Sequence, residues 1–171
     1  MSDLEVTYEV KGRAAWLTID REARRNSLSP EALQAFHAAL DRAEADPEVR
    51  VIGVTGAGEK VFCSGADLAA SFGGGDVMEG MRAYARVLQR MVEFPKPLVA
   101  RVAGHCLGGG IGLVLACDLA YARQDVTFRT PELGVGLFPM MIGVLILRQV
   151  RRKQALDDVT RTSEVALEML S

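Results

Sequence analysis

Short apolar segments typical of strands alternate along this chain with longer segments of helical periodicity. Val51–Thr55 and Leu98–Val102 are apolar runs of strand length. Between them, Met81, Leu88 and Val92 belong to an apolar stripe at helical spacing. This alternation of strands and helices predicts an α/β fold with a largely parallel sheet.

The other expected elements follow the same pattern. Ser29-Pro30 is typical of a helix start, because serine caps the first turn and proline suits its first position. Asp46-Pro47 ends that helix. Further strands are expected at Val6–Val10, Ala15–Ile19, Val61–Phe62, Asp118–Ala122 and Val126–Phe128, and further helices before Ala116 and from about Met140. Residues 1–150 are predicted to form the core domain and residues 151–171 a short helical segment, within a charged stretch, Arg148–Ser171, of helical pattern.

Composition excludes several classes of protein. The formal net charge is −2 and no block of like charges occurs, so neither a nucleic-acid surface nor a basic membrane patch is indicated. Leu137–Leu147 is too short to span a bilayer, and the N-terminus lacks a signal pattern. Three irregularly spaced cysteines and two histidines predict neither disulfides nor a metal site, so we expect a reduced, cytoplasmic protein.

Two glycine-bearing turns stand out as candidate binding elements. The first spans Phe62–Leu68 and the second Gly104–Gly112, and each follows an apolar strand. Small residues let the backbone approach a ligand, and the first N–H groups of a helix have no partner within the helix. Two such turns facing each other would form an oxyanion hole with two donors, whereas a tight turn or close helix packing is the structural alternative.

Nucleotide-binding motifs do not fit these turns. Counting from Gly108 and Gly110, the third glycine of a dinucleotide fingerprint would fall on Leu113. Gly53 and Gly58 have the separation of a phosphate-binding loop, but Glu59 stands where that motif needs lysine.

Five motifs follow one another along the chain: Arg24–Leu28, Phe62–Leu68, Pro95-Lys96-Pro97, Gly104–Gly112 with Ala116-Cys117-Asp118, and Phe128 through Pro131-Glu132 to Pro139. In this order, and over about residues 4–150, they resemble the crotonase superfamily, the enoyl-CoA hydratases and isomerases.

The resemblance implies a superhelix of repeated ββα units, whose C-terminal helical part is short or missing in this chain. It also implies an acyl-CoA substrate, with coenzyme A as part of the substrate and no covalently bound cofactor. Assembly as a homotrimer or a dimer of trimers is expected. The oxyanion donors map onto the N–H groups of Ala66 and Gly109. The expected substrate-binding residues are Arg24, Asn26, Leu28, Ser64, Gly65, Asp67, Leu68, Gly108 and Phe138.

This chain departs from the hydratases of the family in its acid/base groups. Those hydratases resemble one another in using two glutamates. Gly112 stands at the first of those positions, and Glu132 at the second. A single carboxylate can still move a proton between two carbons, as shifting a double bond requires. The alternative roles are a helix-start or salt-bridge carboxylate for Glu132 and plain core packing for Phe138.

Three functional hypotheses follow from these residues. The first is an enzyme that isomerises or hydrates an enoyl-CoA through Glu132. The second is a non-catalytic acyl-CoA-binding protein, and the third an interaction subunit of a hetero-oligomer. Nucleophilic catalysis by Cys106 beside His105 is disfavoured, because neighbours in sequence seldom face each other as that chemistry needs.

Overall fold

The computed structural model describes residues 5–67, 77–131, 140–149 and 164–165. Its larger sheet has five strands in the order β1-β2-β3-β5-β7. The first two strands form an antiparallel hairpin around Gly12, and the remaining neighbours pair in parallel. The bounds are β1 (Val6–Lys11), β2 (Ala14–Ile19), β3 (Val51–Gly56), β5 (Leu98–Val102) and β7 (Leu119–Ala122).

A smaller sheet of four strands, in the order β4-β6-β8-β9, completes the architecture. Its first three strands run parallel, whereas β9 is antiparallel to β8. Their bounds are β4 (Val61–Cys63), β6 (His105–Leu107), β8 (Phe128–Arg129) and β9 (Glu164–Val165). The expected α/β class and largely parallel pairing are confirmed, and the strands divide between two sheets.

Two strands of the smaller sheet were not anticipated. His105–Leu107 lies within the second glycine-bearing turn, Gly104–Gly112, and forms β6. Glu164–Val165 falls in the stretch expected to be helical, and that expectation is wrong at these two residues because they form β9 against β8. Strands of two or three residues are too short to show a period, so only their pairing partners reveal them. The domain division at residue 150 stays a prediction.

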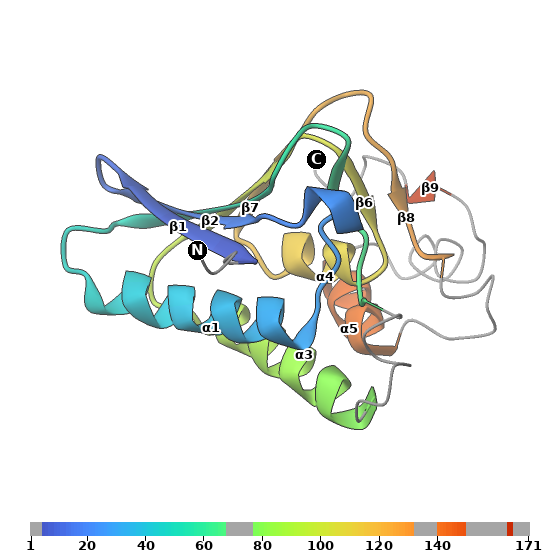
Figure 1. Ribbon diagram of the computed structural model, residues 1–171, viewed down its shortest axis with the longest axis horizontal. Coiled ribbons are helices and arrows are strands. Elements are labelled where there is room, and N and C mark those ends of the chain that lie inside the picture. Colours follow the sequence, from blue (N-terminus) through green and yellow to red (C-terminus); the bar gives the residue numbers. More distant parts are fainter. Residues whose placement is uncertain (1–4, 68–76, 132–139, 150–163, 166–171) are drawn as a thin grey trace.

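The helices cover the sheets from one side and pack on one another. In Figure 1, α1 (Pro30–Ala45) and α3 (Val77–Val92) run side by side below the larger sheet, and α4 (Gly109–Leu115) lies above α5 (Met140–Gln149). A short 3₁₀ turn, η1 (Glu22–Arg24), precedes α1. The expected cap is confirmed: the Ser29 side chain accepts a hydrogen bond from the Ala32 amide at 3.0 Å. None of the helices in the described ranges combines the length and apolar character needed to cross a membrane.

The buried face of α1 supports the larger sheet through Phe36, whose side chain is 0% exposed. We expect Phe36→Ala to lower the free energy of unfolding by about 3–5 kcal/mol, because the lost ring leaves a cavity beneath the sheet. Urea denaturation followed by circular dichroism measures this change. The matched control is Gln34→Ala on the exposed face of the same helix, which should stay within about 0.5 kcal/mol of the parent chain. A loss for Phe36→Ala as small as that of the control would contradict this account of the core.

Candidate active site

The two glycine-bearing turns meet because the strands before them are neighbours. In the parallel pair β4–β6, Val61 lies opposite His105 and Cys63 opposite Cys106. Parallel strands end at the same edge of a sheet, so the segment after Cys63 and the segment after Leu107 leave that edge side by side. The second segment passes through Gly108, the N-cap of α4.

The backbones of the two turns touch at Gly65 and Gly109. A Cβ atom on Gly65 would lie 2.8 Å from the Gly109 nitrogen, and a Cβ on Gly109 would lie 3.4 Å from the Gly65 Cα. Gly65 also has a φ of +87°, a region that residues with a side chain rarely adopt. Glycine at position 65 is therefore required both by the backbone conformation and by the contact.

Most amides of the first turn are engaged in hydrogen bonds. The Ser64 N–H donates to the Arg25 carbonyl at 3.2 Å, and the Gly65 N–H donates to the Cys63 sulfur at 3.4 Å. The Asp67 N–H donates to the Leu28 carbonyl at 3.1 Å. This pattern leaves the amide of Ala66, which is an exposed residue, as the donor of this turn without an acceptor in the described part of the chain.

The second turn offers a comparable donor. The Gly108 N–H is bonded to the Arg129 carbonyl at 2.8 Å, whereas the Gly109 N–H has no acceptor among residues 5–67, 77–131, 140–149 and 164–165. Gly109 is half-buried and opens α4, where amides have no partner within the helix. The contact between Gly65 and Gly109 therefore brings two available N–H donors to one edge of the sheet, an arrangement suited to a carbonyl oxygen that gains negative charge.

A segment from the start of the chain braces the first turn. Leu28 forms an isolated parallel bridge with Ala66, and its N–H donates to the Gly65 carbonyl at 2.8 Å. Asn26 is 0% exposed and has a φ of +53°. Its side chain accepts a hydrogen bond from the Arg21 amide at 3.0 Å and donates two, to the carbonyls of Ala57 at 2.9 Å and Val61 at 2.7 Å. Asn26 thus holds the loop from within, and its direct contact with a substrate stays a prediction.

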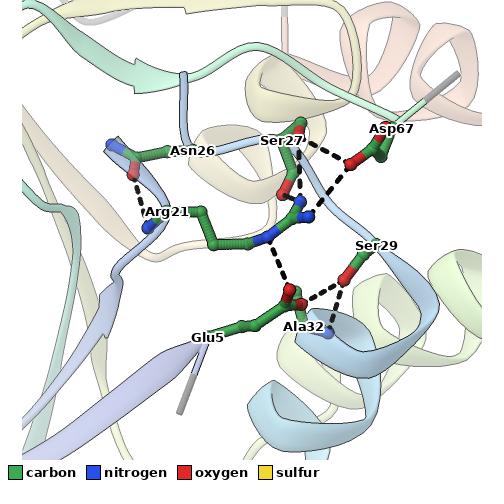
Figure 2. A network of polar contacts seen from close by, with 7 residues as sticks. All are labelled: Glu5, Arg21, Asn26, Ser27, Ser29, Ala32 and Asp67. Carbon is green, nitrogen blue, oxygen red and sulfur yellow. Dashed lines mark hydrogen bonds and ion pairs between the residues drawn. The ribbon is translucent and has the colours of Figure 1, made fainter. Parts of the chain in front are cut away.

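Arg21 ties this loop to the turn through a partly buried polar network (Figure 2). The guanidinium contacts the carboxylate of Glu5 at 2.9 Å and that of Asp67 at 3.0 Å. It also donates to the Ser27 carbonyl at 2.5 Å and to the Ser27 hydroxyl at 2.9 Å. The Arg21 and Asp67 side chains are only 12% and 10% exposed, so little water screens the pair. The network anchors the residue that directly follows Ala66.

The remaining predicted site residues fall into two groups. Arg24 is exposed, Ser64 is half-buried, and Gly108 caps α4 with a φ of +49°. Leu68, Glu132 and Phe138 lie outside the described residues. The structure thus brings together Leu28, Gly65, Ala66, Asp67, Gly108 and Gly109, and the roles of all these residues stay predictions.

The enoyl-CoA hydratase/isomerase family model matches residues 9–166. The chain belongs to this family. It is 36% identical over 134 residues to the (E)-benzylidenesuccinyl-CoA hydratase of Thauera aromatica and 34% identical over 137 residues to the short-chain-enoyl-CoA hydratase of Clostridium acetobutylicum. These alignments cover 77% and 78% of this chain but 52% of each relative, so the chain spans about half their length.

Solved structures of the family share the fold of this member. An enoyl-CoA hydratase from Bacillus anthracis superposes with a TM-score of 0.90 at 26% identity. The superposition covers 96% of this chain and 65% of that one. The resemblance to the crotonase superfamily is thereby confirmed, and so is the α/β fold shared with its solved structures.

The cysteines of this family member are buried and free, and burial raises the pKa of each thiol. The pKa is about 12 for Cys63 and for Cys117, and it also lies well above its usual range for Cys106. His105 is exposed and turns its Nδ1 toward Thr127, 3.1 Å from the Thr127 amide. No thiolate–imidazole pair forms here. Among the described residues, no group of three or more His, Cys, Asp or Glu side chains is placed to hold a metal ion.

These raised pKa values predict slow reaction with thiol reagents. At about pH 8.5 an ordinary thiol is half ionised, whereas a thiol with a pKa of about 12 is ionised on the order of one part in a thousand or less. Alkylation of the native chain by iodoacetamide should therefore be at least about 100-fold slower than that of the urea-unfolded chain, as mass spectrometry can follow. Rapid modification of Cys106 in the native chain would contradict its burial.

The contact between the two turns can be tested by a substitution at Gly65. Gly65→Ala should destabilise the chain by about 3 kcal/mol or more, because left-handed strain of about 1–2 kcal/mol adds to the overlap with the Gly109 backbone. Gly12→Ala is the matched control, since Gly12 has a φ of +62° but no atom within 4 Å of the added Cβ. Equal losses of unfolding free energy in urea for the two variants would show that the turns are not in contact.

Sequence reasoning missed two residues that support the site. In the sequence, Arg21 is one of three arginines between positions 21 and 25, and Tyr84 lies at helical spacing among the apolar residues Met81 and Leu88. No local pattern distinguishes Arg21 from Arg24 or Arg25, because its partner Asp67 is 46 positions away. The hydroxyl of Tyr84, which donates a hydrogen bond to the Gly109 carbonyl, likewise depends on the packing of α3 beside α4.

Proposed function

We propose that this chain binds an acyl-CoA and polarises the thioester carbonyl with the N–H groups of Ala66 and Gly109. The observation that carries this proposal is the pair of amides without acceptors at two turns in backbone contact. Fixed amide dipoles stabilise the enolate oxygen without reorganising, and removing one such donor typically raises the barrier by about 2.7–4 kcal/mol. Two of the relatives are named as hydratases of CoA esters, and these names support this substrate class.

Glu132 is the proposed acid/base group. It follows Pro131 directly in the sequence. Pro131 lies two residues beyond Arg129, whose carbonyl accepts the hydrogen bond from the Gly108 N–H. The closeness along the sequence between Glu132 and a residue bonded to Gly108 supports the assignment.

The proposed reaction moves a double bond from position 3 to position 2 of the acyl chain. The Glu132 carboxylate takes a proton from the carbon next to the carbonyl, and the electron pair flows onto the thioester oxygen held by the two amides. The enolate then collapses while Glu132 returns the proton two carbons further along. The reaction consumes no water and needs no redox partner, and one carboxylate performs both transfers. Hydration of an enoyl-CoA, which adds water across the same bond, is the other reaction of this site class.

The loop that braces the first turn is the proposed contact for coenzyme A. Arg24 and Arg25 are exposed at the start of this loop, and Leu28 lies against Ala66 at its end. A substrate whose carbonyl reaches Ala66 would therefore pass along this loop, where the two cations can meet phosphates. The expected homotrimer and the cytoplasmic location stay predictions from the family resemblance.

Glu132→Gln tests the proposal, since the amide keeps the shape of the side chain but cannot accept and return the proton. We expect isomerisation of a 3-enoyl-CoA, followed by the absorbance of the conjugated product, to fall at least about 100-fold. Binding of butyryl-CoA, a saturated ligand, should persist in calorimetry. Glu48→Gln, at an exposed carboxylate in the turn after α1, is the control and should retain full activity.

Two results would overturn parts of this proposal. Unchanged isomerisation in Glu132→Gln would remove that carboxylate from the mechanism. Tight binding of butyryl-CoA without turnover of any enoyl-CoA by the parent chain would favour the alternative, a non-catalytic acyl-CoA-binding protein.

A further inference from the structure

The space beside Gly112 is filled by a side chain from another helix. A Cβ atom on Gly112 would overlap the hydroxyl of Tyr84, would lie 2.7 Å from Cγ2 of Ile142, and would lie 3.3 Å from Cδ1 of Leu88. Real Cβ atoms essentially never approach a neighbour as closely as these contacts with Tyr84 and Ile142 would require. While Tyr84 keeps this position, residue 112 has no room for any side chain.

Position 112 is close to the proposed oxyanion hole for a simple geometric reason. Residues three apart on a helix lie on the same face, so a side chain at 112 would stand next to Gly109. Tyr84 occupies that space from α3, the helix that packs beside α4. Its hydroxyl is therefore a polar group that the structure places beside both Gly112 and the Gly109 carbonyl.

Tyr84 also contacts Gly109 itself. The hydroxyl donates a hydrogen bond to the Gly109 carbonyl, and a Cβ on Gly109 would lie 3.3 Å from Cζ of the ring. The residue is 6% exposed, so packing restricts its rotamer and little water competes for the bond. The same glycine that offers its N–H to the thioester oxygen is thus held at its carbonyl by Tyr84.

We propose that Tyr84 is a positioning residue with two effects on the site. Its hydroxyl fixes the Gly109 backbone in the orientation that aims the N–H at the substrate carbonyl. Its bulk keeps a second acid/base group out of position 112, so that the site works with a single carboxylate. This inference rests on the proposed function, because it assigns how the same amide pair is held and how many proton carriers serve it.

Tyr84→Phe tests the first effect by removing the hydroxyl and keeping the ring. We expect kcat for 3-enoyl-CoA isomerisation to fall about three- to tenfold, the equivalent of one lost hydrogen bond, with KM changed less than about twofold. Infrared difference spectra of bound butyryl-CoA, labelled with carbon-13 at the thioester carbonyl, should show a smaller shift of the carbonyl stretch to low frequency. A merely structural role would leave this stretch unchanged.

Tyr8→Phe is the matched control. It removes a buried hydroxyl of β1 that has no hydrogen-bond partner within the described ranges, in the larger sheet and away from β4 and β6. Its kcat and its carbonyl stretch should equal those of the parent chain. If Tyr84→Phe matched Tyr8→Phe in both measurements, the positioning role would be overturned.

A double-mutant cycle tests the second effect. In the parent chain Gly112→Ala should lower the urea midpoint, although alanine ordinarily stabilises a helix relative to glycine. In a Tyr84→Ala background the same change should cost less, because the overlapping hydroxyl is gone. An equal drop in both backgrounds would show that Tyr84 does not occupy the space at position 112.

The infrared measurement separates this inference from the proposed function, because butyryl-CoA has no double bond to move. A parent chain that polarises bound butyryl-CoA but turns over no enoyl-CoA would refute the catalytic proposal. Loss of that polarisation in Tyr84→Phe would still support the positioning role. A parent chain that turns over 3-enoyl-CoA, with no effect of Tyr84→Phe on kcat or on the stretch, would refute the positioning role alone.

Discussion

The backbone contact between Gly65 and Gly109 is the constraint on which the site depends. Two turns can lie this close only if neither carries a side chain at the point of contact and if the strands before them are parallel neighbours. The parallel pairing of β4 with β6 makes the strands neighbours. Glycine at positions 65 and 109 leaves the point of contact without side chains, and glycine also suits the φ of +87° at position 65. Because backbone groups form the candidate donors, their positions follow from the pairing of β4 with β6 and from the start of α4.

The amides around the contact are made available by selective hydrogen bonding. Leu28, Arg25 and Cys63 satisfy the other N–H groups of the first turn, and the Arg129 carbonyl satisfies that of Gly108. Arg21 then holds Asp67 through an ion pair whose side chains are 12% and 10% exposed (Figure 2). Asn26 acts on the backbone, whereas Arg21 acts mainly through the side chains of Glu5, Ser27 and Asp67.

The proposed role of Tyr84 connects this backbone arrangement with the choice of reaction. Hydration needs a water molecule to be held and activated while the α-carbon receives a proton, which two carboxylates can share between them. Isomerisation needs one carboxylate and a stabilised enolate. The side chain of Tyr84 fills the space at position 112 and donates a hydrogen bond to the Gly109 carbonyl. The positioning role that we propose for it would favour the reaction that needs one carboxylate.

The α/β class, most of the strands and helices, and the two turns with their candidate donors Ala66 and Gly109 could be predicted from the sequence. These features are local: periodicity, a capping serine and glycine spacing are all read within a few residues. The division into two sheets, the strands β6 and β9, and the contacts of Arg21 and Tyr84 with the two turns depend on the folded arrangement. Arg21 pairs with a residue 46 positions away and Tyr84 with one 25 positions away, and strands of two or three residues exist only through their partners. Contacts of that range leave no periodic trace in a single sequence, because they are set by how the elements pack.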